Sequence, residues 1–410
     1  MRAFLYRLRL WARKLGVRVI SIAALSVLSV FAAKYSGVYV PAGVAEKIGA
    51  DSVVSLLNII ANSMLTVTTF SLSVMVTIHR NASSQWTPRA HRMHLRDSRT
   101  QTVIATFLGA YIYALLSLIL LDTPYFGDKE VVALFVTTLG VIAWIVYQML
   151  MWVLHLQTFG SLEQTADRIH EQTRDALQLR MSHPCLGGHA LLDRSIIPMD
   201  AKPVFAARSG YVVRMMASAL DSAAEDCGGA IYIIVDVGEH ITKGDPIAFT
   251  TGQTEKMTEA VEQNIDIGHH RDIEQDPNFG LLMLAEIGEK ALSPGVNDGG
   301  TAIDMIDRMA ELAETHEDLG ETTYKNLWMP PLNTGDIIRR PFDLISRYAI
   351  TSLEVQEVLL KRLDILSRHP DPDIAKAARE VAQDAFDRAQ EALPTKVDKA
   401  KLVKPQCLTG

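Results

Sequence analysis

The stretch that decides the fold is VVSLLNIIANSMLTVTTFSLSVMVTI, residues 53–78, together with TVIATFLGAYIYALLSLILL, residues 102–121. The two segments are 26 and 20 residues long, and neither contains Asp, Glu, Lys, Arg or His. An apolar helix of about 20 residues is long enough to cross the hydrocarbon core of a bilayer. The two segments therefore predict an integral membrane protein.

Two further apolar segments extend the prediction to four spans. Residues 19–40 are apolar apart from Lys34, and residues 131–154 contain no charge. A basic start followed by an apolar run is also typical of a signal peptide, and Ala32-Ala33 keeps that interpretation open. We favour a first span because no convincing cleavage site follows. The prediction is an α-helical membrane domain of four transmembrane helices over residues 19–155.

The distribution of basic residues predicts the orientation. Residues 1–18 carry six Lys or Arg and no acid, and residues 79–101 carry five Arg against one Asp. The loops at 34–51 and 122–130 carry only two and one basic residues. Basic loops stay on the cytoplasmic side of an inner membrane. Both termini and everything after the fourth span are therefore predicted to be cytoplasmic.

The same basic residues predict contact with anionic lipid headgroups. Residues 1–18 form a basic interfacial segment, and the central loop carries Arg80, Arg89, Arg92, Arg96 and Arg99. A metal or pH role for His91 and His94 is the less favoured alternative. Residues 1–154 carry 14 Lys and Arg against 6 Asp and Glu, and the rest of the chain carries 26 against 41. The acidic remainder argues against a nucleic-acid partner, because phosphate binding needs clustered Lys and Arg.

The part after the spans reads as a cytoplasmic α+β domain with a small β module and several helices. We predict a connecting helix and linker over residues 156–200, the β module over 201–254, a helical part over 255–393 and a tail over 394–410. Within the helical part we expect helices over 279–292 and 341–368, with a capping box at Thr301 and Asp304 starting another between them.

A polar stripe runs along the second span. Its residues are spaced three or four apart and fall within an arc of about 100° on one helix: Ser55, Asn58, Asn62, Thr66, Thr69, Ser73 and Thr77. Polar groups in lipid must face a partner, a cavity or water. One interpretation, which we favour, is a packing seam between helices; the other is a water-lined path through a homo-oligomer. The spans carry no internal acid or His, which argues against a proton pump or coupled transporter.

Nothing in the sequence predicts catalysis, a cofactor or a metal site. There is no GxSxG, P-loop, HExxH or GxGxxG motif. The spacing of His183, Cys185 and His189 matches no zinc pattern. Glu286 and Glu289 are explained by helix solvation. We therefore expect a non-enzymatic membrane protein. The leading hypothesis is an oligomeric channel or pore lined by the second span, and the alternative is a membrane-anchored sensor or scaffold whose cytoplasmic domain binds a ligand or partner.

Residues 276–308, DPNFGLLMLAEIGEKALSPGVNDGGTAIDMIDR, carry a family resemblance. Phe279-Gly280, Asp307-Arg308 and the turn Ser293, Pro294, Asn297 and Asp298 resemble the core signature of the DUF2254 family of predicted bacterial membrane proteins, whose function is unassigned. The resemblance implies several N-terminal spans and a soluble domain in a bacterial inner membrane. Gly299-Gly300 departs from the pattern, where Pro and a bulkier residue are expected. We favour a structural role for the turn, since Pro, Asn and Asp stop helices and redirect the chain; ligand binding there is the alternative.

Overall fold

The structure is a computed structural model that describes residues 50–85, 87–95, 98–122, 128–158, 161–315 and 320–409, with isolated residues at 17, 20, 21, 24, 27, 28 and 31. The chain divides into two compact units, an N-terminal unit, Met1–Gln164, and a C-terminal unit, Thr165–Gly410.

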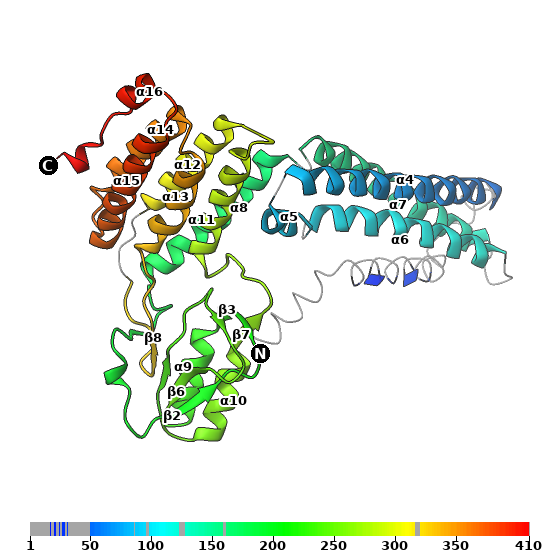
Figure 1. Ribbon diagram of the computed structural model, residues 1–410. Helices are drawn as coiled ribbons and strands as arrows, with labels where there is room; N and C mark the ends of the chain where they lie inside the picture. Colours follow the sequence, from blue (N-terminus) through cyan, green and yellow to red (C-terminus); the bar gives the residue numbers. More distant parts are fainter. Residues whose placement is uncertain are drawn as a thin grey trace. The chain divides into compact units, whose positions relative to one another are not determined.

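Long helices make up the described part of the N-terminal unit (Figure 1): α4 Ala50–Gln85, α5 Pro88–Leu95, α6 Ser98–Leu121 and α7 Asp128–Thr158. Three of them contain a stretch long and apolar enough to cross a membrane, at Asp51–Ile78, Thr100–Leu121 and Val131–Leu156. These stretches agree with three predicted spans. The first predicted span, residues 19–40, lies outside the described residues apart from isolated helical positions, so this first span, and with it the total of four, stays a prediction.

Helix α6 packs against both α4 and α7, which also contact each other. Leu57, Phe107 and Leu134 are fully buried where the three helices meet. A polar link joins α6 to α7 in this apolar core: the hydroxyls of Tyr113 and Thr138 are 2.9 Å apart. Thr138 donates its own proton to Leu134 O at 2.7 Å, so Tyr113 donates to Thr138. Both hydroxyls are thereby satisfied away from water.

Two small sheets form the β part of the C-terminal unit. The five-stranded sheet has the order β1-β8-β4-β6-β2, and the three-stranded sheet has the order β5-β3-β7. The strands are β1 His189–Ala190, β2 Lys202–Phe205, β3 Gly210–Met215, β4 Ile231–Ile233, β5 His240–Ile241, β6 Pro246–Thr250, β7 Ile265–Gly268 and β8 Leu327–Met329. β8 pairs in parallel with β1 and β4, so the sheet takes strands from well outside residues 201–254.

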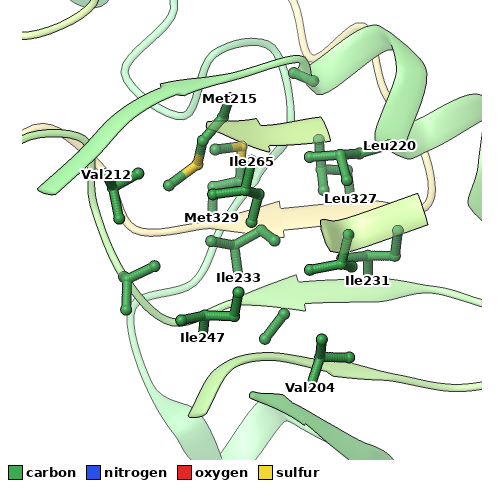
Figure 2. Packing of buried hydrophobic residues seen from close by; sticks show 14 of the residues in the cluster. Val204, Val212, Met215, Leu220, Ile231, Ile233, Ile247, Ile265, Leu327 and Met329 are labelled. Carbon is green, nitrogen blue, oxygen red and sulfur yellow. The ribbon is translucent and has the colours of Figure 1, made fainter. Parts of the chain in front are cut away.

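Both sheets bury one face in a common apolar core, together with α9 Ala217–Asp226 and α10 Thr254–Asn264. Figure 2 shows Ile231, Ile233 and Met329 of the larger sheet beside Met215 of the smaller one and Leu220 of α9. Successive side chains of a strand point to opposite faces. The core on one face therefore requires a different row of residues on the other.

That other face carries an aromatic row across the larger sheet. His189, Trp328 and Tyr232 are register partners on β1, β8 and β4. The ring centroids of His189 and Trp328 are 4.8 Å apart, and those of Tyr232 and Trp328 are 4.9 Å apart. Phe249 continues the row on β6 as the partner of Tyr232. Stacked cross-strand pairs of this kind stabilise the sheet and fix its register.

Helices form the rest of the C-terminal unit: α8 Leu162–Ser182, α11 Pro277–Ala291, α12 Gly299–Ala313, α13 Asp336–Tyr348, α14 Leu353–Leu366, α15 Pro372–Ala392 and α16 Lys396–Lys401, with single 3-10 turns η2 Arg194–Ile196 and η3 Gln406–Leu408. α11 packs against α12 and α13, and α14 packs against α12 and α15. The helix predicted over residues 279–292 is confirmed as α11.

One helix prediction and one capping prediction are wrong. Residues 341–368 form two helices, because the chain leaves the helix after Tyr348 and Ser352 takes an extended backbone, with φ −103° and ψ 105°, before α14 begins. Serine is among the residues that favour such a start. The N-cap of α12 is Asp298 and not Thr301: the Asp298 side chain accepts from the backbone N–H of Thr301 at 3.0 Å.

Candidate functional site

The polar stripe lies entirely on the exposed face of α4. All seven residues, Ser55, Asn58, Asn62, Thr66, Thr69, Ser73 and Thr77, are exposed. The buried face of the same helix carries Val53, Leu57, Ile60 and Met64, which pack in the core shared with α6 and α7. The periodicity therefore separates two faces of one helix, and the polar face is turned away from the described neighbours in this chain.

The hydroxyls of Thr66, Thr69, Ser73 and Thr77 bond to their own helix. Thr66 donates to Asn62 O at 3.0 Å, Ser73 donates to Thr69 O at 3.0 Å and Thr77 donates to Ser73 O at 2.9 Å. A hydroxyl that has donated its proton still has lone pairs that accept hydrogen bonds. In the C-terminal half of the stripe, from Thr66 to Thr77, the hydroxyl protons are therefore already donated, and the hydroxyl oxygens remain available as hydrogen-bond acceptors.

The two asparagines of the stripe differ from the hydroxyls. Among the residues that the structure describes, the side-chain amides of Asn58 and Asn62 have no hydrogen-bond partner. An amide offers two donors and an acceptor, and lipid cannot satisfy them. These two side chains therefore point to water or to polar groups outside the described part of this chain.

The basic loop is described only in part. Arg80 is exposed in α4, and Arg89 and Arg92 are half-buried in α5. Thr87 caps α5 by accepting from the backbone N–H of Ala90 at 3.3 Å, which positions the basic residues that follow. Arg96 and the side chain of Arg99 lie outside the described residues. Contact of this loop with lipid stays a prediction.

The signature turn connects α11 to α12. Ser293 donates its hydroxyl proton to Lys290 O at 2.7 Å, and Pro294 follows on the surface. Asn297 has a φ of 52°, in the left-handed region that Asn tolerates. The carboxylate of Asp298 accepts from the N–H and the hydroxyl of Thr301, and these hydrogen bonds lower the pKa of Asp298. Ser293, Asn297 and Asp298 each have a local structural role, which supports the structural interpretation.

Other signature residues hold the helices together. Gly280 lies against Thr173 of α8, where an added Cβ would overlap the Thr173 hydroxyl. Asp307 pairs with Arg362 of α14 at 2.8 Å, and Arg308 pairs with Asp167 of α8 at 2.6 Å. One stretch of sequence thus fixes the contacts of α11 and α12 with α8 and α14.

An ionic cluster that is buried at Arg180 and Asp276 and partly exposed at Asp236 and Arg271 was not predicted. Arg180 is 1% exposed and donates to both carboxylate oxygens of Asp236, at 3.1 and 3.2 Å. Arg271 pairs with Asp276 at 2.7 Å. Burial raises the pKa of Asp276, against the hydrogen bond and charge of Arg271. Gly238 is required beside this cluster, since its φ is 88° and an added Cβ would overlap Asp276.

The cluster joins α8, the segment after β4 and the start of α11. Arg180 and Asp236 are far apart in sequence, whereas Arg271 and Asp276 are five residues apart. The position of Arg180 on the apolar side of the amphipathic helix α8 indicates that this arginine is buried and needs a partner, but the sequence does not show which residue that partner is. A buried ion pair contributes less to stability than its Coulomb energy suggests, yet removing one partner is costly. The cluster has a structural role, because its ion pairs connect α8, the segment after β4 and the start of α11.

A charged cleft of about 460 Å³ lies in the C-terminal unit. It is lined by residues of α8, of α12 and its C-terminal end, and of α14: His170, Asp304, Asp307, Arg308, Ala310, Glu311, Glu314 and Arg362. Within the described residues no group of three or more His, Cys, Asp and Glu is arranged to hold a metal ion. The cleft is thus a polar site of small-molecule size without a metal-binding geometry.

Comparison with known proteins gives a family and no activity. The family model for "Predicted membrane protein (DUF2254)" matches residues 7–364. Uncharacterized proteins from Mycobacterium tuberculosis and Mycobacterium bovis are 24% identical over 266 residues, which is 62% of this chain and 50% of theirs. The chain thus spans about half the length of these curated relatives. No solved structure matches it significantly. Because the family model covers most of the chain, including the stripe-bearing helix and the signature turn, this chain belongs to the DUF2254 family of predicted membrane proteins.

Proposed function

We propose that the chain forms a homo-oligomer in a bacterial inner membrane, in which the polar faces of α4 surround an axis and line a channel. The observation that carries this proposal is the exposure of all seven stripe residues on a helix whose opposite face is buried against α6 and α7. The termini and the C-terminal unit are cytoplasmic in this proposal, and the basic loop lies at anionic headgroups.

The energetics favour an assembled state. Asn58 and Asn62 lie in an apolar helix and have no partner among the described residues. An interhelical hydrogen bond in a membrane contributes roughly 0.6–2 kcal/mol. Copies that meet at α4 gain such bonds several times over, or expose the amides to water along the axis. The stripe carries hydroxyls and amides but no charge. The polarity and width of the channel, rather than fixed charges, would therefore determine which ions pass.

Light scattering in mild detergent, with the detergent contribution subtracted, tests the assembly, and ion flux in liposomes tests the channel. We expect three or more copies and measurable conductance. The double variant Asn58→Leu/Asn62→Leu should abolish most of the flux. The matched control is Val146→Leu/Val153→Leu, at two exposed positions of α7, and it should conduct as the wild type does. A monomer, or a double variant with unchanged conductance, would refute the proposal.

A membrane-anchored sensor is the second candidate, and the charged cleft of the C-terminal unit favours it. In this proposal the helices serve as an anchor and the C-terminal unit binds a ligand or partner. Conductance separates the two candidates. The channel proposal requires ion flux through the protein, whereas a sensor needs only to bind its ligand and requires no flux.

A further inference from the structure

The segment that follows α15 is basic, whereas the rest of the C-terminal unit is acidic. Residues 394–410 carry four Lys and one Asp, and residues 165–393 carry 22 Lys and Arg against 39 Asp and Glu. The one acid of the segment, Asp398, is already engaged, because its carboxylate accepts from the Thr395 hydroxyl at 2.6 Å. The segment is therefore a local positive surface on an otherwise negative unit.

This basic segment is packed against the helices of the unit. Leu393 and Leu402, on either side of α16, are 3% and 4% exposed. The backbone N–H of Cys407 donates to the carboxylate of Asp364 in α14 at 2.7 Å, and η3 contacts α15. The outer surface of the segment is therefore presented in a fixed orientation.

That outer surface combines unpaired lysines with exposed valines. Lys396, Lys401 and Lys404 are exposed and have no ion pair among the described residues. Val397 and Val403 are 63% and 76% exposed. Residues four apart on a helix are neighbours on its surface, so Val397 lies next to Lys401. Exposed apolar side chains among lysines are typical of surfaces that bind at a lipid interface.

We propose that this surface, formed by α16 and residues 402–404, binds the headgroups of anionic lipids. The lysine ammonium groups pair with lipid phosphates, and the two valines enter the apolar edge of the headgroup layer. The positive charge of the surface complements the negative charge of such headgroups. The proposal requires a chain in a membrane and depends on neither the channel nor the sensor.

The connection between the two units favours a lipid surface over a soluble partner. Helix α8 begins at Leu162, four residues after α7 ends at Thr158. The C-terminal unit is therefore tethered to the bilayer that α7 enters. A tethered surface meets its target at a high effective concentration, so even a weak intrinsic affinity is enough for binding.

The charge of the three lysines sets the expected size of the effect. One basic residue near an anionic membrane surface increases affinity about fivefold, so three increase it on the order of 100-fold. The attraction falls off within a Debye length, about 10 Å at 0.1 M salt. Binding should therefore be strong at anionic bilayers, weak at zwitterionic ones and reversed by high salt.

Fluorescence quenching of the full chain in lipid nanodiscs tests this contact. A nitrobenzoxadiazole label is attached at Val397→Cys, with Cys227→Ser and Cys407→Ser to remove the accessible native thiols; Cys185 is buried. The quencher is a lipid with a nitroxide on its headgroup, present at the same fraction in each bilayer. We expect strong quenching in an equal mixture of phosphatidylcholine and phosphatidylglycerol, and little quenching in phosphatidylcholine alone or at high salt.

Two triple variants separate this surface from net charge in general. The test variant replaces the three lysines of the surface: Lys396→Gln/Lys401→Gln/Lys404→Gln. It should lose most of the quenching in the anionic bilayer. The matched control replaces three exposed lysines of α10, α14 and α15: Lys256→Gln/Lys361→Gln/Lys376→Gln. It removes the same charge and should be quenched as the parent protein is.

Three results would overturn the proposal. Equal quenching in the two bilayers would show that lipid charge does not attract the surface. An equal loss in both triple variants would indicate a general effect of net charge. A blue-shifted emission without lipid quenching would indicate that a second copy of the chain covers the surface. The measurement needs only a chain inserted in a bilayer, so a failed conductance assay would leave these outcomes unchanged.

Discussion

Replacing Gly280 by alanine should destabilise the C-terminal unit strongly. The added Cβ would overlap the hydroxyl of Thr173 and lie 2.9 Å from its Cβ and 3.0 Å from its Cγ2. Thr173 is fully buried and its hydroxyl donates to Ile169 O at 2.6 Å, so it cannot turn away without losing that bond. The alternative is separation of α8 from α11.

The magnitude follows from three effects. Overpacking a buried contact costs about 1–3 kcal/mol, and we take the upper value because the overlap is deep. Loss of the Thr173 hydrogen bond adds about 1 kcal/mol. Alanine is better than glycine inside a helix by about 1 kcal/mol. The expected net destabilisation is about 3 kcal/mol, which lowers the Tm of a domain of this size by about 6–12 °C.

Thermal unfolding of the full chain in mild detergent measures this shift. Gly299→Ala is the matched control, because Gly299 lies in α12 and an added Cβ there meets Val355 at an ordinary 3.5 Å. The double variant Thr173→Ala/Gly280→Ala should recover part of the loss, since it removes two of the three close atoms. A Tm for Gly280→Ala equal to that of the wild type would refute the close approach of α8 and α11.

Two further predictions concern charges. Asp236→Ala leaves Arg180 buried without its carboxylate. Because the side chain of Asp236 is itself 32% exposed, we expect a destabilisation at the lower end of the range for a broken buried pair, about 3 kcal/mol. An unchanged denaturation midpoint would contradict this expectation. Asp298→Ala removes the cap of α12 and should cost about 1 kcal/mol. Hydrogen bonds lower the pKa of Asp298 in the fold, so its contribution is complete above the unfolded pKa and is lost as the pH falls below about 4; the difference between wild type and variant in urea denaturation should vanish there.

The membrane helices could be predicted because their signal is local. Length and absence of charge define a span, and the spacing of Asn58, Asn62 and Thr66 places them on one face. The sequence also predicted α11, since an amphipathic helical pattern runs over residues 279–292 and Pro294 ends it. These features depend on residues within a few turns of each other.

The features that were missed depend on contacts between distant segments. β8 is three residues long and is defined by pairing with β1 and β4. The break between α13 and α14 lies within a stretch whose apolar residues keep a helical period on both sides, so the spacing alone does not reveal it. The pairs Arg180–Asp236 and Arg308–Asp167 join residues that no spacing rule connects. The lining of the cleft comes from three helices for the same reason.

The aromatic row has a practical consequence for spectroscopy. Trp328 is the one tryptophan of the sequence after residue 164, and the other four are Trp11, Trp86, Trp144 and Trp152. Its ring is stacked between His189 and Tyr232 on strands drawn from three separate segments. With the other four replaced by phenylalanine, the intrinsic fluorescence of the chain would come from this ring as its sole indole. The emission would then report the integrity of the five-stranded sheet independently of the membrane helices.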